Sequence, residues 1–531
     1  MKKLLKFFSA SGVWVAGLGV FYFLTHLIGL TKLPVFADEA IYIRWAQLIM
    51  DDSSRYALFA LNDGKTPLFI WSLIPWQYVF SDQLWAGRWL AVLVGAGQIL
   101  IFARLLKEFG LSKKWQLGGS LLMSILPFWF FHHRMALMDG MLVMWLTLSW
   151  LGLLRAIKTR HWSWTLLTGV SFGLALLTKL PAILFAPVLA LAAIQPFLTA
   201  TKSTEKLKFS LEKFVFLILQ AGLAGAIGFG LFLLLKFSPA FGQLFSRGGD
   251  FLFRFSELSF SQVGKNLWNN GRVFLTVFGT YLTWPSLGLI FAALFVPKQR
   301  RTLMLLILMT LSFILPIQIM GKVIYARYLL PAALPLTVAL VLSLEALISA
   351  VTTETTKPKW LLRSIKSLLI ALFLGSIITT SIRFMIYSWL NPNYLPLTVS
   401  DQVQYLTEWS AGNGVVEVSQ AALKVAEKNS LLVLTEGYFG TLPDGVLLYL
   451  HGKNLHNLFV EGIGQPIHGL PQPMIEKAQR YDQVWLVVNS HRLKLTLPAE
   501  NLLGQYCRLP GAPCLQIWDL KPYLKTLSKP N

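Results

Sequence analysis

Two adjacent carboxylates near the N-terminus are placed where chemistry explains them better than packing does. Asp38 and Glu39 follow the apolar segment 11–30 by a few residues. Neither carboxylate gains from burial by itself, because an unpaired charge is costly away from water. Such a group accepts a proton from a substrate hydroxyl, or it stabilises the N-terminus of a helix, here the one expected over 40–50. The two roles are compatible, since Asp38 could act as a base while Glu39 caps.

The composition indicates an integral membrane protein. Of the 531 residues, 55% are hydrophobic and only 14% are charged, which is too apolar for an ordinary soluble protein. The formal net charge of +22 raises nucleic-acid binding as an alternative. However, the lysines and arginines form short clusters between apolar runs, which is how cytoplasmic loops are marked. We therefore expect the lipid bilayer, and no nucleic acid, as a partner.

The apolar runs predict a polytopic α-helical protein with about eleven spans. The first run is long for a signal peptide, so we expect an uncleaved first helix with its N-terminus inside the cytoplasmic membrane. Every basic cluster then falls inside and Asp38 outside. Segments 40–50 and 68–80 are expected to lie at the outer interface. The predicted spans are 11–30, 88–106, 115–131, 137–154, 164–178, 181–197, 214–235, 273–296, 303–320, 328–350 and 368–389.

Residues 391–531 have the composition of a soluble domain, which parity places outside. Buried strands are expected at 431–435, 458–460 and 484–488, between helices at 402–409, 421–427, 446–451 and 475–480. This alternation predicts a small α/β domain with a mostly parallel sheet. Cys507 and Cys514 flank a Pro-Gly turn, so they form either a local disulfide or two free thiols.

Polar residues at the outer ends of the spans define the candidate site, because a charge there is costly unless it is paired or functional. Acids beside cations on one side of the membrane suit a reaction in which an anionic group leaves a donor while a carboxylate deprotonates an acceptor. The set comprises Asp38, Glu39, Lys65, His132, His133, Arg134, Asp139, Lys179, Lys322, Tyr325, Arg327 and Tyr328.

Structural explanations compete at several of these positions. Lys65 could be an interfacial lysine that reaches water, and Arg327 could belong to an aromatic and arginine belt. Asp139 could cap a helix, with His133 and Arg134 as its ion-pair partners. A divalent metal at these histidines is disfavoured, because adjacent histidines on a loop point in different directions. Lys179 lies between two apolar runs and must reach the surface or an internal anion, for which we expect a phosphate or a carboxylate.

Five short motifs, taken in order, resemble those of the protein mannosyltransferase and aminoarabinose transferase family. These C-type glycosyltransferases take a sugar from a polyprenyl phosphate carrier, and the resemblance covers about residues 1–390. Ala40 and Ile41 follow the acidic pair where relatives often carry polar residues, and Thr66 replaces a second proline, which bears on sugar and acceptor identity. The motifs are Asp38-Glu39, Gly64-Lys65-Thr66-Pro67-Leu68, Met135-Ala136-Leu137-Met138-Asp139, Leu177-Thr178-Lys179-Leu180-Pro181 and Ala326-Arg327-Tyr328-Leu329-Leu330-Pro331.

The resemblance implies a C-type glycosyltransferase fold over 1–390 and a role for each site residue. Asp38 would be the catalytic base, with Glu39 the second choice. The donor phosphate would be held by Lys65, Lys179, Arg327, Tyr325 and Tyr328, with His133, Arg134 and Asp139 as further candidates and no metal. The implied reaction inverts the anomeric carbon of a polyprenyl-phosphate sugar and transfers it to a protein, lipid or cell-envelope glycan at the outer face. A transporter or flippase of lipid-linked sugars is the alternative, although such proteins commonly have paired halves, which are not evident here.

Overall fold

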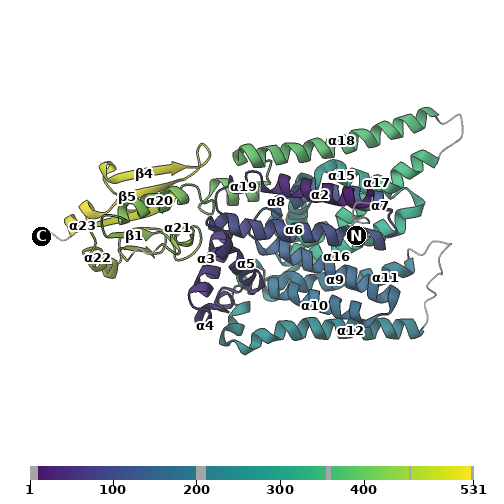
Figure 1. Cartoon of the computed structure of the whole chain (residues 1–531), viewed down its shortest axis with the longest axis horizontal. Helices are drawn as coiled ribbons and strands as arrows, with labels where there is room; N and C mark the ends of the chain where they lie inside the picture. The colour runs from purple at the N-terminus through teal and green to yellow at the C-terminus, as the bar shows by residue number, and fades with distance from the viewer. Residues whose placement is uncertain (1–9, 199–210, 354–359, 454–455, 528–531) are drawn as a thin grey trace, which may run out of the picture.

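The computed structural model describes residues 10–198, 211–353, 360–453 and 456–527. A bundle of long helices forms one end of the molecule and a small sheet with short helices forms the other (Figure 1). Within the described residues, seven helical stretches are long and apolar enough to cross a membrane. They are Gln83–Glu108, Met138–Thr159, Val215–Phe237, Phe260–Ala293, Pro297–Met320, Ala326–Val351 and Ser364–Leu390.

The polytopic helical architecture is confirmed, and the seven stretches match seven of the predicted spans. The other four predicted spans correspond to shorter helices. The predicted span 115–131 is divided before Pro127, since proline lacks the N–H that would continue the helical hydrogen bonding. The shorter helices are α2 (Ala10–Leu27), α7 (Lys113–Ile125), α8 (Pro127–His132), α10 (Trp162–Thr178), η2 (Leu180–Phe185) and α11 (Ala186–Leu198).

The long helices follow the apolar runs of the sequence, and short helical turns join them at the end of the bundle near the sheet (Figure 1). The long ones are α6 (Gln83–Glu108), α9 (Met138–Thr159), α12 (Leu211–Leu233), α14 (Phe260–Phe278), α15 (Trp284–Ala293), α16 (Pro297–Met320), α17 (Leu330–Thr353) and α18 (Trp360–Leu390). The turns include η3 (Leu234–Phe237), η4 (Pro239–Phe245), α13 (Gly248–Phe251), η5 (Phe255–Glu257), η6 (Gly279–Thr283) and η7 (Ala326–Leu329).

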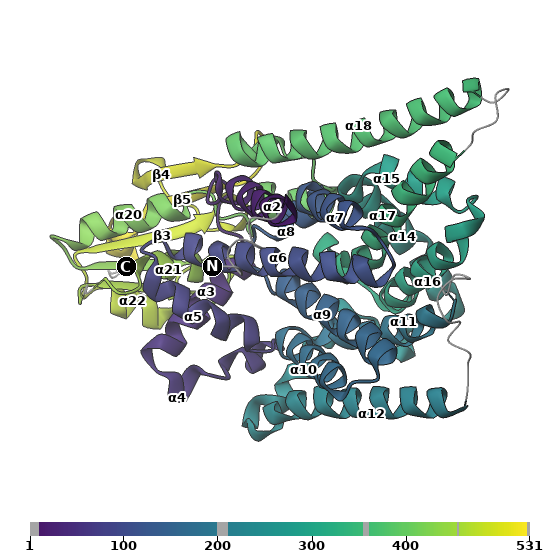
Figure 2. The ribbon, with the colours of Figure 1, turned by 45° about the vertical axis from the view of Figure 1, so that its right-hand side comes forward.

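Between the bundle and the sheet lie the two segments expected at the interface. Residues 40–50 fall in α3 (Ala37–Asp51), and residues 68–80 form α5 (Leu68–Val79), with α4 (Ser53–Tyr56) and η1 (Phe59–Asp63) between them. Helices α3 and α5 contact each other, and α3 also contacts α21 (Asp444–Leu450) of the C-terminal part (Figure 2). Helix α3, which carries Asp38, is therefore packed against both parts of the molecule.

A five-stranded sheet organises the C-terminal part, in the order β2-β1-β3-β5-β4. The three predicted strands are confirmed as β1 (Leu431–Thr435), β2 (Leu458–Gly462) and β3 (Gln483–Asn489), which are parallel. Two further strands, β4 (Leu502–Cys507) and β5 (Cys514–Asp519), form an antiparallel hairpin, closed by a Cys507–Cys514 disulfide. The helices are α20 (Val415–Ala426), α21, α22 (Gln472–Ala478) and α23 (Lys521–Leu527), with short turns η9 (Pro392–Tyr394), α19 (Val399–Gln402), η10 (Val403–Thr407), η11 (Ser490–Arg492) and η12 (Ala499–Asn501).

Backbone hydrogen bonds tie the C-terminal part to the first loop. The Ala37 N–H donates to the Ser410 carbonyl at 3.0 Å, and the Gly412 N–H donates to the Val35 carbonyl at 2.9 Å. Gly412 leaves room for this approach, because a Cβ there would lie 2.4 Å from the Val35 carbonyl oxygen. The segment 408–412 is thus held directly beside the acidic pair.

Candidate active site

The first ion pair of the site joins Asp38 to Arg327 across 289 positions of sequence. Asp38 lies in the first turn of α3, and Arg327 lies in η7, which leads into α17. Arg327 Nη2 lies 2.9 Å from Asp38 Oδ2, and the Asp38 side chain keeps 24% of its surface exposed while Arg327 keeps 6%. A substrate can therefore reach the carboxylate, whereas the guanidinium is held in place.

Aromatic rings surround the Arg327 guanidinium. Its central carbon lies 5.0 Å from the ring centre of Phe36, 4.9 Å from that of Tyr325 and 5.5 Å from that of Tyr328. Rings attract a cation through their faces and displace water around it. A planar guanidinium held in place in this way suits a phosphate, whose oxygens accept two parallel hydrogen bonds.

The second ion pair joins Lys179 to Asp139. Lys179 follows the C-terminus of α10, and Asp139 lies in the first turn of α9. Lys179 Nζ lies 2.7 Å from Asp139 Oδ1, and it also lies over the Tyr328 ring, 4.8 Å from its centre. The ring of Tyr328 thus contacts both cations, so the sequence-predicted residues Asp38, Asp139, Lys179, Tyr325, Arg327 and Tyr328 form one cluster, which we call the double ion-pair cluster.

Glu39 has a different environment from that of its neighbour Asp38. It is fully buried and accepts two hydrogen bonds from Arg88, from Nε at 2.9 Å and Nη2 at 2.7 Å. The backbone N–H groups of Ala136 and Phe36 donate to it at 2.7 and 3.0 Å. Both oxygens are occupied, and the bond from Phe36 caps α3 as a helix N-terminus requires. This geometry favours Asp38 over Glu39 as a proton acceptor.

His133 and Arg134 are placed away from the cluster. Arg134 donates to the carbonyls of Thr25, His26, Ile28 and Gly29 at 2.8–3.1 Å, in the last turn of α2 and the turn that follows it. His133 Nε2 is 3.0 Å from Gln98 Oε1. The ion pair of Asp139 is with Lys179 rather than with either residue. Among the described residues, no group of three His, Cys, Asp or Glu side chains could hold a metal ion.

Lys65 forms a separate set of ion pairs. Its Nζ lies 2.7 Å from Asp63 Oδ2, while Asp63 Oδ1 accepts from Arg247 Nη1 at 2.6 Å. These pairs join η1 to the turn that follows η4. In the described parts of the chain, no hydrogen bond or ion pair links Lys65 to the double ion-pair cluster.

Four residues that the sequence analysis did not select support the cluster from the bundle and from the segment after α18. Gln404 Oε1 accepts from Arg327 Nη1 at 2.7 Å, and the Tyr405 hydroxyl lies 3.4 Å from the same nitrogen. Asp401 accepts a hydrogen bond from the Tyr281 hydroxyl. Burial raises the pKa of Asp401 to about 6. The only sequence signal was that Gln404 and Tyr405 fall in the helix expected over 402–409, directly after Asp401.

Known proteins share part of this sequence and the fold. Residues 56–245 match the family described as dolichyl-phosphate-mannose-protein mannosyltransferase. The crystal structure of ArnT from Cupriavidus metallidurans bound to undecaprenyl phosphate aligns over 98% of this chain and 100% of that chain, with 15% identity and a TM-score of 0.61. The resemblance to C-type glycosyltransferases is confirmed. The likeness to ArnT includes the C-terminal sheet, because nearly the whole of both chains is aligned.

A second solved structure shares the fold more distantly. The archaeal oligosaccharyltransferase AglB from Archaeoglobus fulgidus, in complex with an inhibitory peptide and a dolichol-phosphate, aligns over 90% of this chain and 69% of that chain, with 12% identity and a TM-score of 0.50. No curated protein matches the sequence significantly. The family match covers Lys65, Asp139 and Lys179, whereas Asp38 and Arg327 lie outside it.

Proposed function

We propose that this protein transfers a sugar from a polyprenyl-phosphate-linked donor to an acceptor at the outer face of the cytoplasmic membrane. The observation that carries the proposal is the double ion-pair cluster, in which two cations contact the ring of Tyr328 and each is paired with a carboxylate. The fold shared with ArnT and the mannosyltransferase family match support it. Residues 1–390 would be the transmembrane glycosyltransferase domain and residues 391–531 the domain outside.

The ion pairs suggest how a donor would be bound. A phosphate brought between Arg327 and Lys179 would exchange places with the carboxylates that now pair with them, because a charge-assisted bond to phosphate is comparable in strength. The Asp38 oxygen released by Arg327 would then be available to an acceptor hydroxyl. The aromatic side chains of Phe36, Tyr325 and Tyr328 would keep bulk water away from the cations, which strengthens their attraction for the phosphate.

The proposed reaction is a single displacement. Asp38 takes the proton of the acceptor hydroxyl while the oxygen of that hydroxyl forms a bond to the anomeric carbon. The bond from that carbon to the phosphate oxygen breaks, and its electron pair stays on the phosphate as polyprenyl phosphate leaves. Arg327 and Lys179 stabilise the charge that develops there. Attack opposite the leaving group inverts the anomeric carbon, and no metal is required by this scheme.

The decisive test is Asp38→Asn in the full-length protein reconstituted in lipid. We expect transfer from a polyprenyl-phosphate sugar to fall by roughly 100-fold or more per folded molecule, as for loss of a general base, while the melting temperature decreases because Arg327 loses its carboxylate partner. Asp51→Asn, an exposed carboxylate at the other end of α3, is the matched control and should retain activity. Near-normal transfer by the Asp38 variant would overturn the assignment, and lipid-linked sugar translocation without transfer would favour a flippase.

A further inference from the structure

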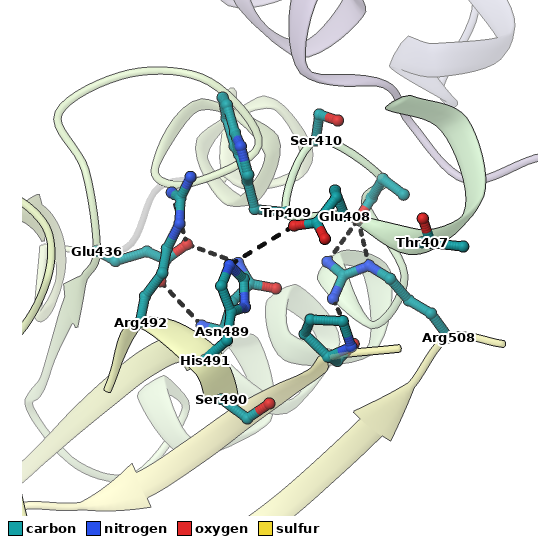
Figure 3. Close-up of polar contacts among 12 residues, drawn as sticks. Thr407, Glu408, Trp409, Ser410, Glu436, Asn489, Ser490, His491, Arg492 and Arg508 are labelled. Atoms are coloured by element: carbon teal, nitrogen blue, oxygen red, sulfur yellow. Dashed lines mark hydrogen bonds and ion pairs between the residues drawn. The ribbon is translucent and has the colours of Figure 1, made fainter. Parts of the chain in front are cut away.

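The carboxyl ends of β1 and β3 form a polar edge that the proposed transfer chemistry does not use. The chain passes from β1 to β2 on one side and then crosses to β3 on the other side, so the order of the sheet reverses between β1 and β3. Open α/β sheets bind ligands outside the carboxyl ends of their strands at such a point. Glu436 directly follows β1, while Asn489 ends β3 and His491 and Arg492 follow it (Figure 3).

Glu436 holds the polar side chains of this edge in position. The side chain of Asn489 donates to Glu436 Oε1 at 2.6 Å, and its backbone N–H donates to Oε2 at 3.0 Å. Arg492 Nη1 adds a bond at 3.3 Å, and its guanidinium lies 4.4 Å from the ring centre of Trp409 (Figure 3). Glu436 is 2% exposed, so these hydrogen bonds hold Asn489 and Arg492 in fixed positions at the edge of the sheet. We call Glu408, Glu436, Asn489, His491 and Arg492 the switch-point cluster.

Two hydrogen-bond acceptors of the cluster receive no hydrogen bond from the described residues. Asn489 is 1% exposed, and its Oδ1 has no hydrogen-bond partner among the described residues. Such a buried polar atom costs free energy unless a ligand or water satisfies it. Glu408 faces His491 at 3.7 Å, which is too long for a hydrogen bond, and its side chain is 40% exposed. Burial lowers the pKa of His491, so the imidazole is mostly neutral at neutral pH and leaves the Glu408 charge unmatched.

The cations at this edge are already engaged. Arg492 is matched by Glu436, as described above. Arg508 donates to the Ala411 carbonyl at 3.1 and 2.7 Å and to the Pro513 carbonyl at 2.7 Å (Figure 3). The free groups are therefore acceptors, and they select a ligand that is rich in hydroxyl donors rather than an anion.

The loop that follows Glu436 carries two exposed aromatic rings, and the Tyr438 ring lies beside Gly464, which follows β2. Tyr438 and Phe439 are 72% and 53% exposed, in the loop that follows Glu436. This loop packs on Trp409, since a Cβ at Gly440 would lie 3.3 Å from the Trp409 ring and the Thr441 hydroxyl donates to the Trp409 carbonyl at 2.9 Å. Gly440 has a φ of 113°, which favours glycine. Flat apolar rings beside polar groups match the two kinds of surface on a sugar ring.

We propose that the switch-point cluster, together with Tyr438 and Phe439, binds a neutral, hydroxyl-rich glycan of the acceptor, an inference that rests on the proposed function. The cluster lies next to the transfer site, because Trp409 adjoins Ser410, whose carbonyl accepts from the Ala37 N–H. A glycan seated there would hold the acceptor beside Asp38. The C-terminal part would thus select the acceptor, while the bundle binds the donor.

The test is binding of soluble probes to the full-length protein in lipid nanodiscs, followed by saturation-transfer NMR. Neutral probes are mannotetraose, maltotetraose and chitotetraose, and mannose 6-phosphate is the anionic probe. We expect at least one neutral probe to bind with a preference over the anionic one. Glu408→Gln and the double variant Tyr438→Ala with Phe439→Ala should each weaken that binding by about fivefold or more. Exposed residues of the same domain provide the controls Glu500→Gln and Phe459→Ala, which should bind as the native protein does.

Each outcome decides the inference. Absence of binding by all neutral probes, preference for mannose 6-phosphate, or equal binding by the cluster and control variants would overturn it. The Asp38→Asn variant separates the two proposals, because it should lose transfer yet bind the neutral probe normally. If the Asp38→Asn variant retains transfer, Asp38 is not the base of the reaction. The glycan site is then tested only by the binding of the probes. A cluster variant should also raise the KM for the acceptor more than it lowers kcat.

Discussion

At the scale of single residues, two neighbouring carboxylates have opposite environments. Asp38 is partly exposed and shares one ion pair, whereas Glu39 is buried with four donors. The sequence predicted an acidic pair at a membrane exit and allowed either residue to be the base. It could not rank them by contacts, because the partners Arg88 and Arg327 lie far away in sequence.

Glu39→Gln should therefore act on stability rather than on chemistry. The substitution leaves the buried Arg88 without a counter-charge, which costs about 3–5 kcal/mol when one partner of a buried pair is removed. We expect a clearly lower melting temperature and near-native activity per folded molecule. Glu417→Gln, an exposed glutamate on α20, is the control. A variant that melts normally but does not transfer sugar would instead identify Glu39 as the base.

At the scale of elements, the segment 398–407 reaches from the C-terminal part into the double ion-pair cluster. Only its residues 402–407 were expected to be helical, as part of a helix over 402–409, but the segment forms α19 and then the wider turn η10. This path brings both Asp401 and Gln404 toward the bundle, to Tyr281 and Arg327 respectively. Local periodicity predicted a helix here, but it carries no information about which bundle residues the helix would meet.

Gln404→Leu should weaken use of the donor, because Arg327 Nη1 loses its hydrogen bond to Gln404 Oε1. A hydrogen bond to a charged group contributes roughly 1.5–3 kcal/mol, so we expect kcat/KM for the donor to fall about tenfold or more. The KM for the acceptor should change little. The neighbouring exposed Gln402→Leu provides the control. Equal effects on donor and acceptor would indicate a general structural role and contradict positioning of Arg327.

Asp401 should make stability depend on pH. Because its pKa is raised to about 6, above the value near 4 of an unfolded chain, the folded protein binds more protons between these values. Unfolding free energy should therefore decrease as pH rises from about 4 to about 6, by at most roughly 2–3 kcal/mol. Asp401→Asn should flatten this part of the pH profile of the melting temperature. An unchanged profile would show that Asp401 is charged throughout.

At the scale of the whole molecule, the sequence predicted the class of architecture well, because apolar runs and basic clusters follow directly from insertion in a bilayer. The parallel strands β1, β2 and β3 were also visible as short apolar runs. The hairpin of β4 and β5 was not assigned as strands, since β4 alternates only between half-buried and exposed positions. Convergence of α3, α9, the end of α10 and η7 on the double ion-pair cluster depends on tertiary packing that no local pattern encodes.

The arrangement of charges predicts the orientation of the protein. At one end of the bundle, Lys158 and Arg155 of α9 pair with Glu108 of α6 at 2.9 and 2.7 Å. The opposite ends of these helices carry Arg88 and Asp139, which meet Glu39 and Lys179 at the end next to the sheet. The basic ends and the site are therefore separated by most of the helix length, which for the 26 residues of α6 is about 39 Å. The positive-inside rule then places the site and the sheet outside.

Single cysteines test this orientation in intact cells. Ser53→Cys is at an exposed position of α4, at the end of the bundle that carries the site. Glu500→Cys is at an exposed position of the sheet domain, and Ser112→Cys lies at the basic end of the bundle. A background with Cys507→Ser and Cys514→Ser removes the native disulfide, so that each variant carries a single cysteine. We expect a membrane-impermeant maleimide to label the first two variants but to label Ser112→Cys only after permeabilisation. The reverse pattern would place the double ion-pair cluster in the cytoplasm and exclude transfer at the outer face, because donor and acceptor would then have to meet Asp38 from the other side.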